Sequence, residues 1–384
     1  AEFYRAQPLD PHVRAIPLRL AKDLKKDPEQ HIGELAAFLV VDANDDFHRV
    51  KRIHDWVADN IRYDVESYYG DLHNAQTGLK GVLSSGQSVC EGYATVFERL
   101  CQEAGITVHK VSGHARGASY DPFAKEDASK SNHAWNVVSI EGRNYLVDTT
   151  WDAGSVTGAR VFEKRYSTAY LFTNPLAFLH THFPTDSQWQ LIDRPLSAEE
   201  FVALPALRGR FFQYGLELAT ADPQMEAAKT EALLRFRLPE NVQVSATLTG
   251  SGRSDTANTV LVQHGEGSAS VAIRFPAPGD WLVRLFVGER EGDDALAWAA
   301  SFPYRATAGS PLRFPTQYKQ FSELQCYLES PMHAPLARGS KVPFRLRVPG
   351  VEEVAAVVDG NRWVHLERLE HDLYAGEVPV NSAR

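Results

Sequence analysis

Three residues of types that act together in nucleophilic catalysis stand in marked segments of this chain: Cys90, His133 and Asp148. Their segments, in chain order, read GQSVCEGYA, NHAW and LVDTTW. A thiolate can attack a carbonyl carbon, an imidazole can take and return the proton, and a carboxylate can hold the imidazole in one orientation. The three residues therefore predict a nucleophilic triad that forms an acyl-enzyme intermediate on an amide.

The sequence around Cys90 predicts that the thiol lies in the first turn of a helix. Ser88 and Glu91 fit the S-x-x-E capping box, which makes Ser88 the expected N-cap and places Cys90 at the second helical position. A helix N-terminus carries partial positive charge and unpaired N–H groups, and an imidazolium at His133 would add to this field. Both effects favour the reactive thiolate form.

His133 and Asp148 are expected on two strands joined by a tight turn. Residues 133–140 and 144–150 read as strands, and the Glu-Gly pair at 141–142 is a hairpin signal. With this turn, residues whose numbers sum to 283 face each other, and His133 becomes a diagonal neighbour of Asp148. A loop one residue longer or shorter would place the two residues on opposite faces of the sheet.

The oxyanion formed during attack on an amide needs hydrogen-bond donors. The backbone N–H of Cys90 is the natural first donor. Four side chains are candidates for a second donor or for contacts with substrate: Gln87, Tyr68, Trp135 and Trp151.

Each of these residue types also has an ordinary structural explanation. A lone cysteine on a helix is commonly a small buried hydrophobe, and Cys101 fits that description. His133 could be a core histidine with a satisfied ring, whereas a buried Asp148 without a partner would be costly. Four other histidines have no matching partner and are expected to be structural or exposed: His109, His114, His180 and His182.

No metal or cofactor is expected at the predicted triad. Cys90, His133 and Asp148 lack the paired spacing that zinc ligands usually show.

Amphipathic helices are expected to form the scaffold before Cys90. Asp27 as N-cap and Pro28 at the first position begin a helix that runs to about Val40. Asn44 opens a second helix, whose apolar residues recur at helical spacing through Ile61.

The segment that contains Cys90 and the segment after it are expected to shape the site. Residues 84–105 contain a third helix, which Gly105 ends, and residues 106–111 form a strand. Residues 113–132 are poor in apolar side chains and separate two members of the predicted triad. Because long loops are commonly functional, we expect a lid or cleft wall there.

The chain is too long, at 384 residues, for one ordinary core. From about Leu204, short alternating strands recur with Gly and Pro turns, which fits a β-sandwich. Residues 303–315 read as a linker, and a second β unit follows. The expected domains are a catalytic domain at 1–200, a β-sandwich module at 205–307 and a small or truncated β module at 316–384.

Composition excludes several classes of function. The net charge of −9 and the lack of a basic run give no footprint for nucleic acid. No apolar stretch approaches the roughly 20 residues that span a membrane, and three cysteines do not make a disulfide framework. The chain begins with Ala, which suggests processing or cloning. Only Cys90 among the cysteines has an evident purpose, which favours a secreted or periplasmic protein over a cytoplasmic one.

The marked segments together resemble the transglutaminase-like superfamily, which has a papain-related α+β fold, over about residues 50–152. The resemblance includes Trp56 and four motifs in the family's order: NIRYD, GQSVCEGYA, NHAWN and YLVDTTW. It implies that Cys90 is the nucleophile, His133 the base and Asp148 the orienting acid. The D-x-T-W ending with Gly154, and the β domains that follow, resemble the kyphoscoliosis-peptidase branch, in which immunoglobulin-like modules follow the enzyme core.

The resemblance implies a cysteine hydrolase or protease that cleaves an amide bond in a protein or peptide. Two alternatives stay open. The first is a protein-crosslinking transglutaminase, although acidic clusters typical of calcium sites are absent from the sequence: Asp121, Glu126 and Asp127 are too scattered. The second is a non-catalytic scaffold whose β modules bind a protein or cell-wall partner.

Overall fold

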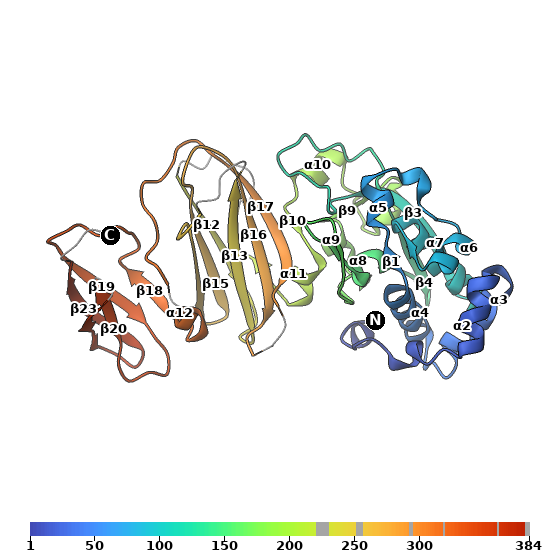
Figure 1. Cartoon of the computed structure of the whole chain (residues 1–384), viewed down its shortest axis with the longest axis horizontal. Coiled ribbons are helices and arrows are strands. Elements are labelled where there is room, and N and C mark those ends of the chain that lie inside the picture. The colour runs from blue at the N-terminus through green and yellow to red at the C-terminus, as the bar shows by residue number, and fades with distance from the viewer. Residues whose placement is uncertain (220–229, 251–255, 292–294, 318, 359–360, 381–384) are drawn as a thin grey trace. The chain divides into compact units, whose positions relative to one another are not determined.

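The computed structural model describes residues 1–219, 230–250, 256–291, 295–317, 319–358 and 361–380 (Figure 1). They divide into two compact units, Ala1–Gly209 and Arg210–Arg384. The first unit mixes helices with an antiparallel sheet, and the second unit consists mainly of β-strands. Within the described residues, no helix is both long and apolar enough to cross a lipid bilayer.

Helices of the first unit surround one five-stranded sheet. The helices are α1 (Glu2–Arg5), α2 (Leu18–Lys26), α3 (Pro28–Val40), α4 (Asp46–Asn60), α5 (Val65–Tyr69), α6 (Leu79–Ser85), α7 (Cys90–Glu103), α8 (Thr149–Ala153), α9 (Pro175–Phe178) and α10 (Ala198–Ala203). Apolar side chains of α3, α4 and α7 make nearly half of its largest buried cluster, which also contains Val138, Val147 and Leu171 from the sheet. This packing fixes α7 against the strands that follow it.

The sheet is antiparallel throughout and has the strand order β8-β5-β4-β3-β9. Its strands are β3 (Thr107–Ala115), β4 (His133–Ile140), β5 (Arg143–Val147), β8 (Leu171–Thr173) and β9 (His182–Pro184). Two smaller pairs accompany it: β1 (Arg62–Tyr63) with β2 (Gln87–Ser88), and β6 (Gly154–Val156) with β7 (Phe162–Lys164). The α+β core expected from the sequence is therefore present.

The predicted helix starts hold to within one residue. Asp27 caps α3 by accepting a hydrogen bond from the N–H of Gln30, and Pro28 is the first helical residue. The second helix, α4, is capped by Asp45 and not by Asn44. Gly105 follows the end of α7 with φ of 74°, the left-handed conformation that glycine adopts at a helix C-terminus.

The second unit contains the expected short strands. The first group is β11 (Glu217–Leu218), β12 (Glu231–Arg237), β13 (Val242–Gly250), β14 (Val260–Gly265), β15 (Ser268–Arg274), β16 (Gly279–Glu289) and β17 (Ala297–Ala306). Strands β11-β12-β15-β14 form one sheet, and β17-β16-β13 form another. Along these strands, buried side chains alternate with partly or fully exposed ones, as a β-sandwich requires.

A second, smaller group of strands follows. It contains β18 (Tyr327–Ser330), β19 (Lys341–Arg347), β20 (Ala355–Val358), β21 (Arg362–His365), β22 (Glu367–Arg368) and β23 (Leu373–Pro379). The order is β18-β19-β23-β22 in one sheet and β20-β21 in the other, around a buried cluster of their own. The strand predicted at 354–359 ends at Val358, and Asp359 lies outside the described residues.

Candidate active site

Cys90 is the first residue of α7, as the predicted position near a helix N-terminus requires. The predicted capping box is wrong. The N-cap is Val89, whose side chain has no hydrogen-bond acceptor. The predicted partners are used elsewhere, because the Ser88 hydroxyl donates to the carbonyl of Gln76 and Glu91 pairs with Lys110. Side chains therefore do not occupy the N–H groups of the first turn. The thiol is partly exposed.

The hairpin that carries His133 has the predicted register. Ile140 faces Arg143 and Asn136 faces Val147, so paired residue numbers sum to 283. Residues 141 and 142 both have positive φ, 52° and 74°, as a type I′ turn demands. The second strand is shorter than predicted: it ends at Val147, and Thr149 and Thr150 begin α8, so Thr150 does not face His133 across the ladder.

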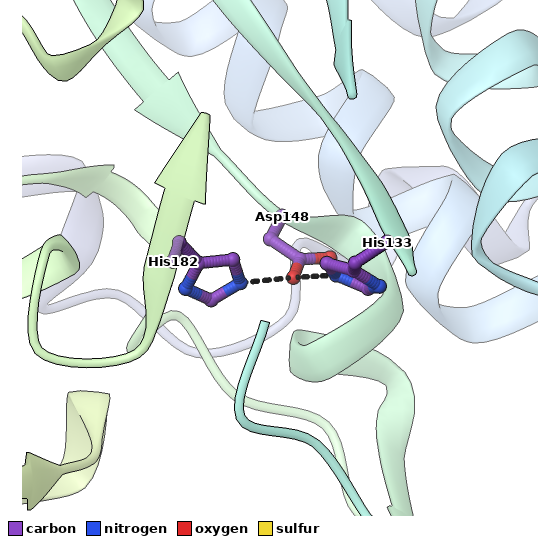
Figure 2. A group of neighbouring side chains, drawn as sticks. All are labelled: His133, Asp148 and His182. Atoms are coloured by element: carbon purple, nitrogen blue, oxygen red, sulfur yellow. Dashed lines mark hydrogen bonds and ion pairs between the residues drawn. The ribbon is translucent and has the colours of Figure 1, made fainter. Parts of the chain in front are cut away.

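His133 donates from Nε2 to Oδ2 of Asp148 over 2.8 Å (Figure 2). Its Nδ1 faces away from Asp148. Burial lowers the pKa of His133, but the charges of Asp148 and Cys90 and hydrogen bonds to both side chains outweigh it and raise the pKa to about 10. The imidazole therefore interacts with both a carboxylate and a thiol, and Nε2 serves the carboxylate.

Asp148 is held from two sides. It caps α8, and its Oδ1 accepts hydrogen bonds from the N–H groups of Thr150 at 2.9 Å and Trp151 at 3.2 Å. Its Oδ2 accepts from His133 and, at 3.1 Å, from Nε2 of His182. Burial raises the pKa of Asp148, yet the charge of His133 and the hydrogen bonds from both histidines hold it well below its ordinary range. All four acceptor positions of the carboxylate are used.

His182 is the partner that the sequence did not reveal. We expected it to have no matching partner, but it is fully buried and bonds to the carboxylate of the predicted triad. The residue lies 34 positions after Asp148, at the start of the edge strand β9. No local spacing rule connects the two residues, because the contact depends on β9 joining the sheet through β3.

Two parts of the chain match known families. Residues 33–149 match the model of the transglutaminase-like superfamily, and residues 198–307 match the KY-like, immunoglobulin-like domain. The chain carries a transglutaminase-like domain followed by a KY-like immunoglobulin-like domain. The expected fold class, a transglutaminase-like α+β core followed by immunoglobulin-like β modules, is confirmed.

The relatives found are longer proteins. Kyphoscoliosis peptidase from Mus musculus is 32% identical over 226 residues, which cover 59% of this chain and 32% of the relative. Kyphoscoliosis peptidase from Homo sapiens is 32% identical over 200 residues, 52% of this chain and 30% of the relative. Hillarin from Drosophila melanogaster is 27% identical over 212 residues, 52% and 26% respectively. The chain thus spans less than a third of the length of these relatives.

The four expected substrate contacts of the transglutaminase-like domain lie in different surroundings. Gln87 is exposed in β2, three residues before the thiol. Burial raises the pKa of Tyr68, and electrostatic interactions with Tyr69 and Cys90 add to this effect. Trp151 is half-buried, and its ring centroid lies 5.6 Å from that of His133. Trp135 is only 1% exposed and packs in the core, so its indole is not part of our proposal for substrate contact.

The loop before His133 is anchored to the transglutaminase-like domain. Arg116, itself buried, pairs with Glu126 and donates to backbone carbonyls at the end of α10. His114 also contacts Glu126, at 2.8 Å. The hydroxyl of Tyr68 lies 2.8 Å from that of Ser119 in the same loop. These contacts hold the loop to α5, α10 and β3, and a cleft wall there stays a prediction.

A buried polar network joins α8 to α4. His54 of α4 bonds through Nδ1 to Asp55 and through Nε2 to Asp152 of α8, both at 3.0 Å. Lys51, the Tyr166 hydroxyl and the backbone N–H of Asp10 complete the hydrogen bonding of Asp55. Burial opposes the charged form of His54, but the hydrogen bonds to Asp152 and Asp55 raise its pKa. The network fixes the helix that the carboxylate of the predicted triad caps.

One group within the described part of the chain has the donor set of a metal site: His133, Asp148 and His182, whose ligand atoms lie within 4.8 Å of one another. Both imidazole nitrogens already donate to one carboxylate oxygen. Hydrogen bonding therefore accounts for the cluster without a metal ion. Cys90 is not a member of this group, so the zinc set considered from sequence is not assembled.

The substitution Cys90→Ser should move the titration of His133 to lower pH. Burial disfavours the imidazolium, and Asp148 and Cys90 stabilise it, so removal of the Cys90 sulfur leaves only Asp148 to oppose burial. Histidine-selective ¹⁵N NMR of the full chain measures the midpoint, which we expect to lie below that of the unsubstituted chain. An unchanged midpoint would show that the thiol does not interact with His133.

Proposed function

We propose that the transglutaminase-like domain is a thiol-dependent acyl-transfer enzyme that cleaves an amide bond in a protein or peptide. Cys90 is the nucleophile, His133 the general base and acid, and Asp148 the orienting acid. One observation carries the proposal: Nε2 of the buried His133 lies 2.8 Å from Oδ2 of Asp148, and the interactions of the ring with this carboxylate and with Cys90 raise its pKa against the effect of burial. A histidine with only a structural role has no need of both contacts.

The contacts support an ordinary order of steps. The Cys90 thiolate attacks the amide carbon, and the developing oxyanion accepts a hydrogen bond from the N–H of Cys90 at the start of α7. The imidazolium of His133 gives its Nδ1 proton to the leaving amine as the carbon–nitrogen bond breaks. Neutral His133 then takes a proton from water, which attacks the thioester and releases the acid and the Cys90 thiolate, so that the imidazolium and the thiolate are restored. Gln87 and Tyr68 are the side chains that we propose for the second oxyanion donor.

The arrangement of Asp148 suits this sequence of steps. Its carboxylate remains ionised while His133 changes charge, because four donors surround it. It therefore stabilises the imidazolium and keeps the Nε2–H tautomer of the neutral ring, which leaves Nδ1 free to take a proton.

An activated ester that needs little specific recognition tests the proposal. We expect p-nitrophenyl acetate to place an acetyl group on Cys90, seen by mass spectrometry of the digested protein, and water to release acetate from it. Addition of methylamine gives N-methylacetamide if an amine is the preferred acceptor, which favours a crosslinking transferase over a hydrolase. Acetylation of Cys90 no faster than that of a cysteine-containing peptide would favour a non-catalytic scaffold.

We also propose the domain division at 1–200, 205–307 and 316–384. The unit boundary after Gly209 and the KY-like match over residues 198–307 support a division near residue 200. The immunoglobulin-like modules are proposed to bind a protein or polymer partner and so to bring the catalytic domain to its substrate.

A further inference from the structure

His182 lies in a closed aromatic environment and directs one polar atom at the carboxylate of the proposed triad. Its ring stacks on Phe178 with centroids 3.9 Å apart and an interplanar angle of 22°. Trp135, Trp151 and Tyr170 approach it at 5.2, 4.4 and 5.5 Å. The side chain is fully buried, so water does not compete for its nitrogens.

The contacts of His182 define its tautomer. An ionised carboxylate only accepts hydrogen bonds, so Nε2 of His182 carries the proton in the 3.1 Å contact with Asp148 (Figure 2). The other nitrogen, Nδ1, lies 2.9 Å from the hydroxyl of Thr181, which can donate to it. The neutral Nε2–H form therefore satisfies both nitrogens of the ring.

The surrounding charges keep His182 neutral. Burial lowers its pKa to about 4, although Asp148 favours the protonated form. The charges that face it are Asp148 at the start of α8, His133 on β4 and Arg208, and both cations oppose a further positive charge. The buried carboxylate of Asp148 thus accepts hydrogen bonds from one imidazolium, His133, and one neutral imidazole, His182.

We propose that His182 is a positioning residue that acts through Asp148. Its Nε2–H occupies a lone pair on the same Oδ2 that accepts from His133, and it thereby limits how strongly Asp148 holds the proton of His133. This inference rests on the proposed function, in which His133 must release that charge during each cycle. The two donors compete for one oxygen, so loss of either strengthens the bond to the other.

The sign of the effect separates this role from simple packing. If His182 only fills space, its replacement loosens Asp148, and His133 loses part of the carboxylate that stabilises its charge. The His133 titration then moves to lower pH. If His182 shares Oδ2 as proposed, its replacement by an apolar ring of similar shape leaves His133 as the only histidine that donates to this oxygen. The bond to His133 becomes stronger, and the His133 titration moves to higher pH.

The experiment uses the full chain in the Cys90→Ser background, in which the thiolate does not influence His133. Histidine-selective ¹⁵N NMR follows the His133 midpoint in this background alone and after His182→Phe or His182→Gln. The phenylalanine keeps the stacked ring without a donor, whereas the glutamine amide can replace the Nε2–H. We expect an upward shift on the order of 1 pH unit for His182→Phe and little change for His182→Gln.

An unchanged or lower midpoint in the Cys90→Ser/His182→Phe protein would overturn the proposal. If that protein does not fold, the ¹⁵N shifts of His182 in the unsubstituted chain decide at neutral pH: the Nε2–H tautomer supports the proposal, and the Nδ1–H tautomer or a charged ring contradicts it. Neither measurement depends on the reactivity of Cys90. A failure of the proposed enzyme activity would therefore be seen separately, in the acetylation of Cys90.

Discussion

The substitution Asp148→Asn should reduce turnover of p-nitrophenyl acetate by about 10³–10⁴-fold while the domain stays folded. The amide oxygen can still accept hydrogen bonds from the N–H groups of the first turn of α8, so the start of the helix is kept. The NH₂ group then takes the place of Oδ2 and faces the Nε2–H donors of His133 and His182. Because the NH₂ group and an Nε2–H group are both donors, they cannot form a hydrogen bond with each other. His133 is therefore driven to the Nδ1–H tautomer, whose Nδ1 cannot accept the proton of Cys90.

A second N-cap provides the matched control. Asp27 caps α3 in the same way, with its side chain accepting from the N–H of Gln30. Asp27→Asn makes the same chemical change at a distant helix start, and turnover should stay at the wild-type level. Equal losses in both variants would assign the effect to the helix caps and not to the triad.

The substitution Asp55→Asn should destabilise the chain by about 3–5 kcal/mol. Asp55 is fully buried and pairs with Lys51, which is 2% exposed, and it also accepts from His54 and Tyr166. An amide removes the compensating charge and places an NH₂ group against donors. Urea unfolding of the full chain measures the loss as a lower midpoint.

An exposed pair with the same spacing is the control for this loss. Arg19 and Asp23 form an i,i+4 pair on α2 at 3.3 Å, as Lys51 and Asp55 do on α4. Exposed pairs contribute little to stability because water and salt screen them. Asp23→Asn should therefore leave the midpoint nearly unchanged, and an equally small effect of Asp55→Asn would show that the buried network is not needed for folding.

Features encoded by neighbouring residues could be predicted from the sequence. The Glu141-Gly142 pair determines a turn with two positive φ values, and the turn alone fixes the register that brings His133 towards Asp148. Pro28 after Asp27 likewise predicts the first residue of α3 correctly. Such features depend on contacts within a few residues, where steric and hydrogen-bonding rules apply without knowledge of the fold.

Features that depend on distant partners could not be predicted. Ser88 and Glu91 have the spacing of a capping box, but their side chains bind other partners. The Ser88 hydroxyl donates to the carbonyl of Gln76, and Glu91 pairs with the ammonium group of Lys110. His182 reaches Asp148 only after β9 has joined the sheet. Sequence spacing gives the local possibility, and the tertiary structure decides which partner is used.

Alkylation of Cys90 by iodoacetamide at about pH 6 tests the central claim most directly. The claim is that His133 and the start of α7 keep the thiol in its reactive form. We predict that Cys90 reacts at least about 10-fold faster than the thiol of an unstructured peptide, and that Asp148→Asn abolishes this advantage. A rate for the wild-type chain no greater than that of the peptide would contradict the assignment of Cys90 as an activated nucleophile.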